Sequence, residues 1–205
     1  MKNYSKIEDY EKIINMLSDF CNWGNLSRTC KLSENFIREF QDKIDWYEIS
    51  HFQKLSESFI KEFQDKVDWR WISMKQTLSE DFIREFKDKV DWYYISTCQT
   101  LSEDFIREFQ DKVGQRIMRN QTLSEDFIRE FRDKLDWIYL AKHQKLSEDF
   151  IREFQDKLDW FYISYYQTFY TKDFVLEFID KIYFDAIGSN KSLVDIVSEI
   201  QKEKE

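Results

Sequence analysis

The stretch LSEDFIREFKDKVDWYYISTCQT, residues 78–100, is one copy of a motif that fills most of the chain. Its opening Leu-Ser pair returns every 22 or 23 residues, at Leu32, Leu55, Leu78, Leu101, Leu123 and Leu146. Self-similarity at a short fixed period is typical of folds built by stacking one small unit many times. We therefore predict a solenoid, in which each copy packs mainly on its neighbours.

Each copy carries two signals for the start of a helix. In the first regular copy, Ser33 is suited to cap helix A, over about residues 33–43, and Asp45 to cap helix B, over about 46–54. Neither helix is long enough to be stable alone, so the copies must stack. The predicted fold is all-α: a right-handed α-solenoid of helix pairs, about 23 residues each, forming one continuous domain.

The quality of the copies divides the chain into three regions. Residues 32–168 hold six tandem helix pairs, residues 1–31 a degenerate copy that caps the N-terminal end, and residues 169–205 another degenerate copy and a closing helix. The Trp that opens helix B recurs on the inward stripe, so we assign it to the core and not to a ligand site. The Gln that ends helix B either joins neighbouring copies through backbone hydrogen bonds or faces solvent.

Composition narrows the class of protein further. Charged residues make up 35% of the chain, hydrophobic residues 42%, and there is no proline, which suits short helices and tight corners. No apolar run is long enough to span a bilayer, and the N-terminal residues do not resemble a secretory signal. Cys21, Cys30 and Cys98 follow no disulfide or metal spacing, so we expect a soluble protein of a reducing compartment, the cytoplasm.

Comparison of the copies with one another separates helix A from helix B. Helix A is nearly invariant, including residues expected to face water, whereas the pairs of residues that follow the Trp and the Ile-Ser of helix B vary. Neutral drift would change both helices, and surface ion pairs, at about 0–1 kcal/mol each, constrain helix A only weakly. We therefore predict a recognition face on helix B, opposite the core stripe. Its candidate ligand-binding residues are Tyr47, Glu48, His51, Phe52, Arg70, Trp71, Met74, Lys75, Tyr93, Tyr94, Thr97, Arg116, Arg119, Asn120, Tyr139, Lys142, His143, Phe161, Tyr162, Tyr165 and Tyr166.

The charge of these positions differs from that of the whole chain. The formal net charge is −9, which at first sight argues against nucleic acid, yet the variable positions are mostly aromatic or basic and include one acid, Glu48. Cations for phosphates and rings for bases are what a single-stranded RNA site needs. The same strip would suit an acidic protein surface. We expect single-stranded RNA as the ligand, with a protein partner as the open alternative.

One copy is irregular. The copy that begins at Leu101 has lost one residue, and Val113-Gly114-Gln115 replaces the usual Val-Asp-Trp. Gly114 removes the Asp cap and tolerates backbone conformations that other residues resist. Two interpretations stay open, a designed bend or widened groove and simple decay of one copy.

The repeated string Leu-Ser-Glu-Asp-Phe-Ile-Arg-Glu-Phe-Gln-Asp-Lys-Val-Asp-Trp, over residues 32–168, resembles short tandem helical repeats in proteins of bacteriophages and large DNA viruses. That family has no established activity, so the resemblance implies a viral origin, a host-cell cytoplasmic location and interference with the host through either ligand, including inhibition of a defence protein. In layout alone, the helix pair with a variable face is similar to PUF and PPR proteins, which read one base per repeat.

Catalysis is not expected. The two histidines, His51 and His143, occupy variable positions in different copies, and the sequence has no Gly-rich phosphate loop, metal-spaced Cys/His set or nucleophile motif. We therefore predict a monomeric binding protein with no catalytic residue, metal, cofactor, small-molecule substrate or membrane partner.

Overall fold

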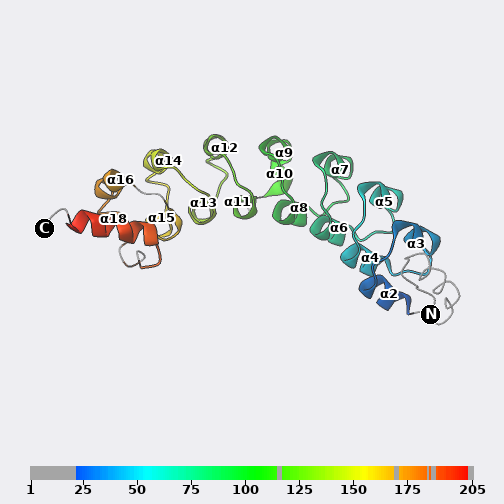
Figure 1. Cartoon of the computed structure of the whole chain (residues 1–205). Helices are drawn as coiled ribbons and strands as arrows, with labels where there is room; N and C mark the ends of the chain where they lie inside the picture. Colours follow the sequence, from blue (N-terminus) through cyan, green and yellow to red (C-terminus); the bar gives the residue numbers. More distant parts are fainter. Residues whose placement is uncertain (1–21, 115–116, 169–170, 184, 186–187, 203–205) are drawn as a thin grey trace, which may run out of the picture. The chain divides into compact units, whose positions relative to one another are not determined.

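The structure, a computed structural model, describes residues 22–114, 117–168, 171–183, 185 and 188–202, and all of the regular secondary structure in these residues is helical. Contacts divide the chain after Gln99 into two compact units, residues 1–99 and 100–205. Both units are built from the same helix pair, so the predicted all-α solenoid is confirmed (Figure 1). The right-handed sense of the superhelix stays a prediction, as do the three sequence regions.

In unit 1, helices of type B and type A alternate, and each helix B contacts the next. The type B helices are α2 (Trp23–Thr29), α4 (Trp46–Phe52), α6 (Trp69–Lys75) and α8 (Trp92–Cys98). The type A helices are α3 (Glu34–Glu39), α5 (Glu57–Glu62) and α7 (Glu80–Glu85).

Unit 2 repeats this pattern with one irregular copy. Its type A helices are α9 (Glu103–Glu108), α12 (Glu125–Glu130), α14 (Glu148–Glu153) and α16 (Lys172–Glu177). Its type B helices are α11 (Ile117–Asn120), α13 (Trp137–His143) and α15 (Trp160–Tyr166), and here too α13 contacts both α11 and α15. A short helix α10 (Gln110–Val113) and a closing helix α18 (Lys191–Lys202) complete the described elements.

Side-chain caps fix the start of both helices where the sequence predicts them. The Ser33 hydroxyl accepts the backbone N–H of Phe36, and the Asp45 carboxylate accepts those of Tyr47 and Glu48. The helices end earlier than predicted, at Glu39 and Phe52.

The predicted length of helix A is wrong, because the backbone leaves the α-helical hydrogen-bond pattern after Glu39. The carbonyl of Phe40 accepts the N–H groups of both Lys43 (2.9 Å) and Ile44 (3.1 Å). The first of these is a tight i→i+3 bond, which closes the helix end and leads the chain to the next cap.

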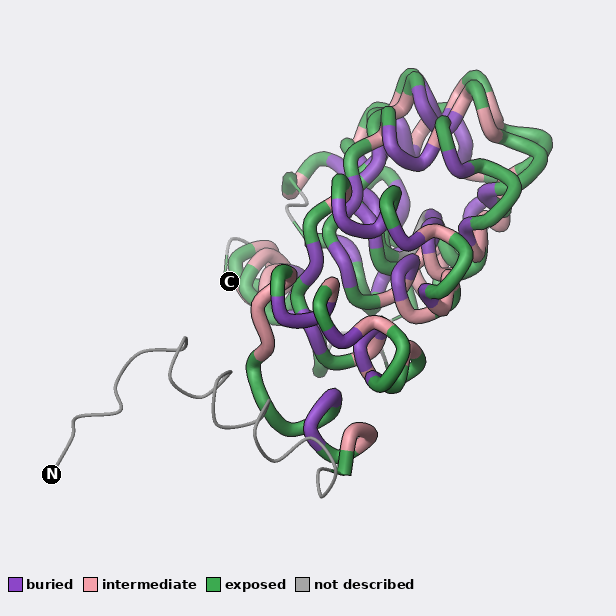
Figure 2. The backbone as a smooth tube through the Cα atoms, turned by 90° about the vertical axis from the view of Figure 1, so that its right-hand side faces the viewer, coloured by how far each residue is buried: buried purple, intermediate pink, exposed green. Residues whose placement is uncertain are grey.

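The core runs between the two helices of each repeat and into the next repeat. Phe59, Ile60 and Ile72 are fully buried, and buried and exposed segments alternate along the backbone (Figure 2). The Trp that opens helix B is only partly buried. Trp46 packs on Phe63 of the following repeat at 4.9 Å between ring centroids, and its indole N–H donates to the Gln41 carbonyl. This Trp therefore packs between repeats and not inside one.

The recurring Gln is a buried tie between repeats, which settles the alternative left open by the sequence. The Gln76 side chain donates to the Gln53 carbonyl (2.8 Å) and accepts from the Leu55 N–H (3.0 Å). Its side chain thus satisfies polar groups of the linker that no helix could satisfy. Asn190 takes the same role at the end of unit 2, where its amide donates to the Gln167 carbonyl.

The irregular copy leaves a small cavity in unit 2. Gly114 has a φ of 55°, a left-handed value that glycine tolerates. A cavity of about 100 Å³ is lined by Gly114, Ile117, Phe127 and Phe131 among others. These two phenylalanines correspond to the ones on which the Trp of other repeats packs, so the cavity occupies the place of the missing indole.

Candidate functional site

The outward side chains of helix A contact the next repeat. The Glu57 carboxylate accepts both the N–H and the hydroxyl of Ser79, the cap of the following helix A. Equivalent contacts join Glu103 to Ser124 and Glu125 to Ser147. The first glutamate of one helix A therefore supports the start of the next.

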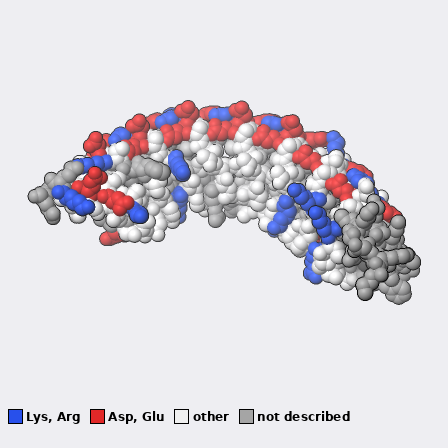
Figure 3. Space-filling model, in the orientation of Figure 1, with Lys and Arg blue, Asp and Glu red and all other residues white. Residues whose placement is uncertain are grey.

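The helix A arginines have several partners each. The Arg129 guanidinium donates to Glu153 of the next repeat (2.8 Å) and to Asp126 (3.0 Å), and it lies 5.2 Å from the ring centroid of Phe150. The hydrogen bond to Glu153 is the main cause that raises the pKa of Arg129. In Figure 3, carboxylates and cations intermingle over helix A. Outward side chains of helix A such as Glu57 and Arg129 thus have more than one contact with the next repeat, and together these restrict the residue type more than one ion pair would. These contacts account for the invariance of helix A.

The four variable positions of helix B form two exposed rows and a half-buried seam. We call outer row 1 the residues after the Trp, namely Tyr47, Arg70, Tyr93, Ile138 and Phe161, all exposed. Outer row 2 ends helix B and comprises Phe52, Lys75, Cys98, Asn120, His143 and Tyr166, also exposed. The seam between the rows comprises Glu48, His51, Trp71, Met74, Tyr94, Thr97, Tyr139, Lys142, Tyr162 and Tyr165, and all but Tyr139 and Tyr165 are half-buried.

The predicted recognition face on helix B is therefore only partly open to solvent, since most of the seam is half-buried. The reason is that adjacent B helices contact directly, so one side of each helix faces its neighbour. Sequence spacing gives the position around one helix and does not include that neighbour.

Seam residues in unit 1 pair across neighbouring repeats. Trp71 stacks on His51 of the preceding repeat, with ring centroids 3.6 Å apart and an interplanar angle of 11°. The Tyr94 hydroxyl accepts two hydrogen bonds from Arg70 of the preceding repeat, at 2.9 and 3.2 Å. These hydrogen bonds are the main cause that raises the pKa of Arg70.

Unit 2 repeats this arrangement with other pairs of residues. The Lys142 ammonium lies 4.3 Å from the ring centroid of Tyr162 in the next repeat. Phe161 packs edge-on against Tyr183 at 5.9 Å, and Tyr162 stacks with Tyr166 at 6.3 Å. Each of these contacts holds a ring in a defined orientation at the surface.

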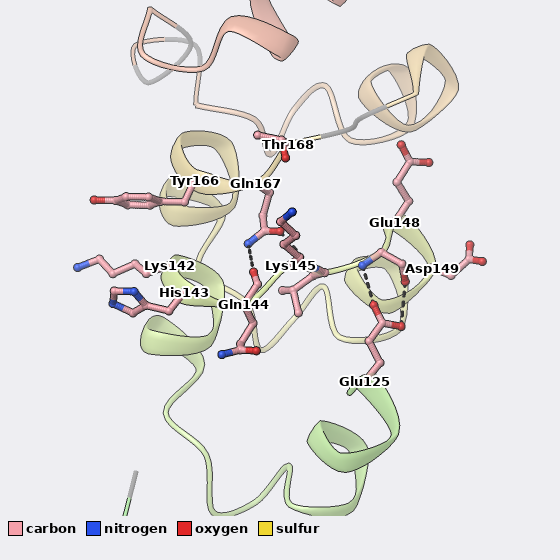
Figure 4. Close-up of a pocket in the computed structure, with 12 residues that line it drawn as sticks. Glu125, Lys142, His143, Gln144, Lys145, Glu148, Asp149, Tyr166, Gln167 and Thr168 are labelled. Carbon is pink, nitrogen blue, oxygen red and sulfur yellow. Dashed lines mark hydrogen bonds between the residues drawn. The ribbon is translucent and has the colours of Figure 1, made fainter. Parts of the chain in front are cut away.

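A groove of about 780 Å³ lies in unit 2, along the linkers that follow helix B. Its floor contains the buried Gln144 and Gln167, and Lys142, His143 and Tyr166 extend together from the helix B side (Figure 4). Carboxylates of helix A line the opposite wall. The groove is thus polar, with cations and a ring along one edge only.

For several predicted site residues, the structure offers no evidence of a side chain available to a ligand. Arg116 and the side chain of Arg119 lie outside the described residues, so the strongest sequence argument for phosphate binding stays a prediction. Thr97 donates its hydroxyl to the Tyr93 carbonyl of its own helix. Glu48 places one buried carboxylate oxygen in the seam, where it has no hydrogen-bond partner among the described residues.

A second set of basic residues lies at the linker edge of helix B, beside the candidate residues. These are Arg28, Lys31, Lys54 and Lys145, all exposed. A sequence signal was present, because the position just after the recurring Gln is Lys in two copies and Thr in the others.

Within the residues that the structure covers, no group of His, Cys, Asp and Glu side chains is placed to hold a metal ion. No helix in the described part of the chain is both long and apolar enough to cross a membrane. No protein-family model, curated protein or solved structure matches the chain. The resemblance to repeats of viral proteins therefore stays a prediction.

Proposed function

We propose that this chain is a non-catalytic scaffold whose helix B faces bind an extended single strand of RNA. One observation carries the proposal. The outer rows of helix B leave rings and cations exposed to solvent, while the charged side chains of helix A contact the next repeat. Exposed rings offer stacking surfaces to any base, and exposed cations offer charge to phosphates.

The seam gives this face preformed surfaces. Because Trp71 is held against His51 and Tyr94 against Arg70, these rings lose little conformational freedom when a ligand binds. Preorganisation of this kind raises affinity by lowering the entropic cost of binding. Each contact also combines residues from two repeats, so the junction between repeats is the unit that would read one base.

Unit 2 favours a second candidate, a protein partner. Its outer row 1 is apolar, with Ile138 and Phe161 each 44% exposed, and Tyr166 of outer row 2 is 47% exposed. Aromatic residues of this kind are enriched in the hot spots of protein interfaces. In that function, the face would dock an extended segment or a helix of the partner.

The test begins with what accompanies the purified protein. We would record its ultraviolet absorbance ratio, sequence any bound nucleic acid, and titrate a labelled single-stranded RNA pool at several salt concentrations. RNA binding that weakens steeply with salt supports the proposal, since phosphate contacts release counterions.

A matched pair of variants makes the test specific. Tyr93→Ala removes an exposed ring of outer row 1 and should lower RNA affinity by about 1–3 kcal/mol. Lys87→Ala changes an equally exposed residue on the helix A side and should leave affinity unchanged. Clean protein that shifts no RNA would contradict the proposal and direct the search to a protein partner.

A further inference from the structure

Four cations of unit 1 differ from most cations on the helix A side of that unit, which form ion pairs. Lys66 and Lys89 of the helix A side pair with Asp42 and Asp65, at 3.1 and 2.8 Å. By contrast, four exposed cations at the edge of helix B have no carboxylate within ion-pair distance among the described residues. We call them the cation track: Arg28, Lys31, Lys54 and Lys75.

The track lies at one end of three consecutive helices. Arg28 and Lys75 occupy the last turns of α2 and α6, and Lys31 and Lys54 lie in the linkers just after α2 and α4. Since α4 contacts both α2 and α6, these ends form one edge of the unit. With neighbouring helices about 8–10 Å apart, the edge is about 16–20 Å long, enough to follow several phosphates of an extended strand. Figure 3 shows cations gathered over α4 and α6 with few acids beside them.

A structural role in the helix ends does not explain the track. Cations do stabilise helix C-termini through the helix dipole. However, α8 and α15 have the same length as α4 and α6 and the same Gln after their last residue, and neither has a basic residue in its last turn. The repeat thus forms this helix end without a cation.

The acids that begin the helices on either side of Lys54 are hydrogen-bonded to other residues. Glu34 and Glu57 begin the helices that flank Lys54, but their carboxylates accept the N–H groups of Ser56 and Ser79. Beside the track, Phe52 of outer row 2 is 48% exposed. One edge therefore combines an open ring with four positive charges that have no carboxylate partner in the part of the chain that the structure describes.

We infer that the cation track holds the phosphodiester backbone of a single strand whose bases stack on the helix B rows of unit 1. The inference rests on the proposed function and adds a phosphate site to it. Lysine suits this role as a compact charge on a flexible stem, which follows a backbone without reading its sequence.

The experiment compares salt dependence across variants with a labelled oligouridylate as the probe. The track variant is Lys31→Gln/Lys54→Gln/Lys75→Gln. The charge-matched control is Lys43→Gln/Lys66→Gln/Lys89→Gln, on the helix A side. In single strands each phosphate contact adds about 0.7 to the slope of log affinity against log salt. We expect the slope to fall by about 2 in the track variant and to stay unchanged in the control.

Two further variants separate the possible causes. Lys31→Arg/Lys54→Arg/Lys75→Arg keeps the charge and should keep the slope, and Trp71→Ala should weaken binding at every salt concentration without changing the slope. Thermal melts of all variants would report any loss of folding.

Two outcomes would overturn the inference. An unchanged slope in the track variant, or equal losses in the track and control variants, removes the phosphate site while RNA binding itself stands. Absence of binding by the unaltered chain instead removes the proposed function.

Discussion

The two helices of one repeat have opposite relations to their neighbours. On helix A, outward polar side chains such as Glu57 and Arg129 have defined partners in the next repeat. On helix B, the outer-row side chains of Tyr93 and Lys75 are exposed to solvent. The comparison teaches that invariance among copies follows from contacts with the next copy, and that variation is confined to positions the next copy does not fully cover.

The largest expected effect comes from the core that the two helices share. Phe59→Ala empties a fully buried position and should lower the free energy of unfolding by about 3–5 kcal/mol. Phe52→Ala, in outer row 2, should change it by less than about 0.5 kcal/mol. Urea unfolding followed by circular dichroism measures both. Similar losses in the two variants would show that Phe52 of outer row 2 is packed as tightly as the core, which would contradict its exposure.

The Gln tie should rank second. Gln76→Ala leaves the Leu55 N–H and the Gln53 carbonyl buried without partners. Each orphaned group costs at least about 1 kcal/mol, so we expect a total loss of at least about 2 kcal/mol in unfolding free energy. The exposed neighbour Thr77, changed to Ala, provides the control. A loss under about 1 kcal/mol for Gln76→Ala would mean that water takes over the hydrogen bonds of the missing amide.

The irregular copy offers a gain instead of a loss. Replacing Gly114 with Asp-Trp restores the repeat length, the cap and the missing indole. Filling a cavity of about 100 Å³ should add about 2 kcal/mol to the unfolding free energy, at about 24 cal/mol per Å³. If the variant is less stable while RNA binding weakens, the irregular copy serves recognition and is not a decayed one.

The smallest expected effect is a difference in stability between charge-removing variants of helix A and of the helix B edge. Glu57→Ala removes the acceptor for the Ser79 cap and should cost about 1 kcal/mol. Lys54→Ala, which loses no ion pair, should leave thermal stability unchanged. High salt should reduce the cost of Glu57→Ala, because screening weakens exposed charge interactions. A larger loss for Lys54→Ala than for Glu57→Ala would reverse the comparison between the two helices.

Local sequence signals predicted some features well and others poorly. Ser33 and Asp45 cap their helices as predicted, because capping depends on residues two or three positions away. The ends of the helices were predicted too far along, since the turn at Phe40 carries no distinctive residue type. For the candidate site, the period and the variability of the repeat identified the residues of both the rows and the seam. They did not predict that most of the seam is half-buried between neighbouring B helices.

The sequence by itself determined the repeat, its two helix starts and the residues that vary, because these depend on short spacings that every copy restates. Only the tertiary structure decided that Trp71 rests on His51, that Gln76 ties two linkers, and that Lys31, Lys54 and Lys75 share one edge. These residues lie about one repeat apart in sequence. Their proximity depends on how one helix pair stacks on the next, which no single copy contains.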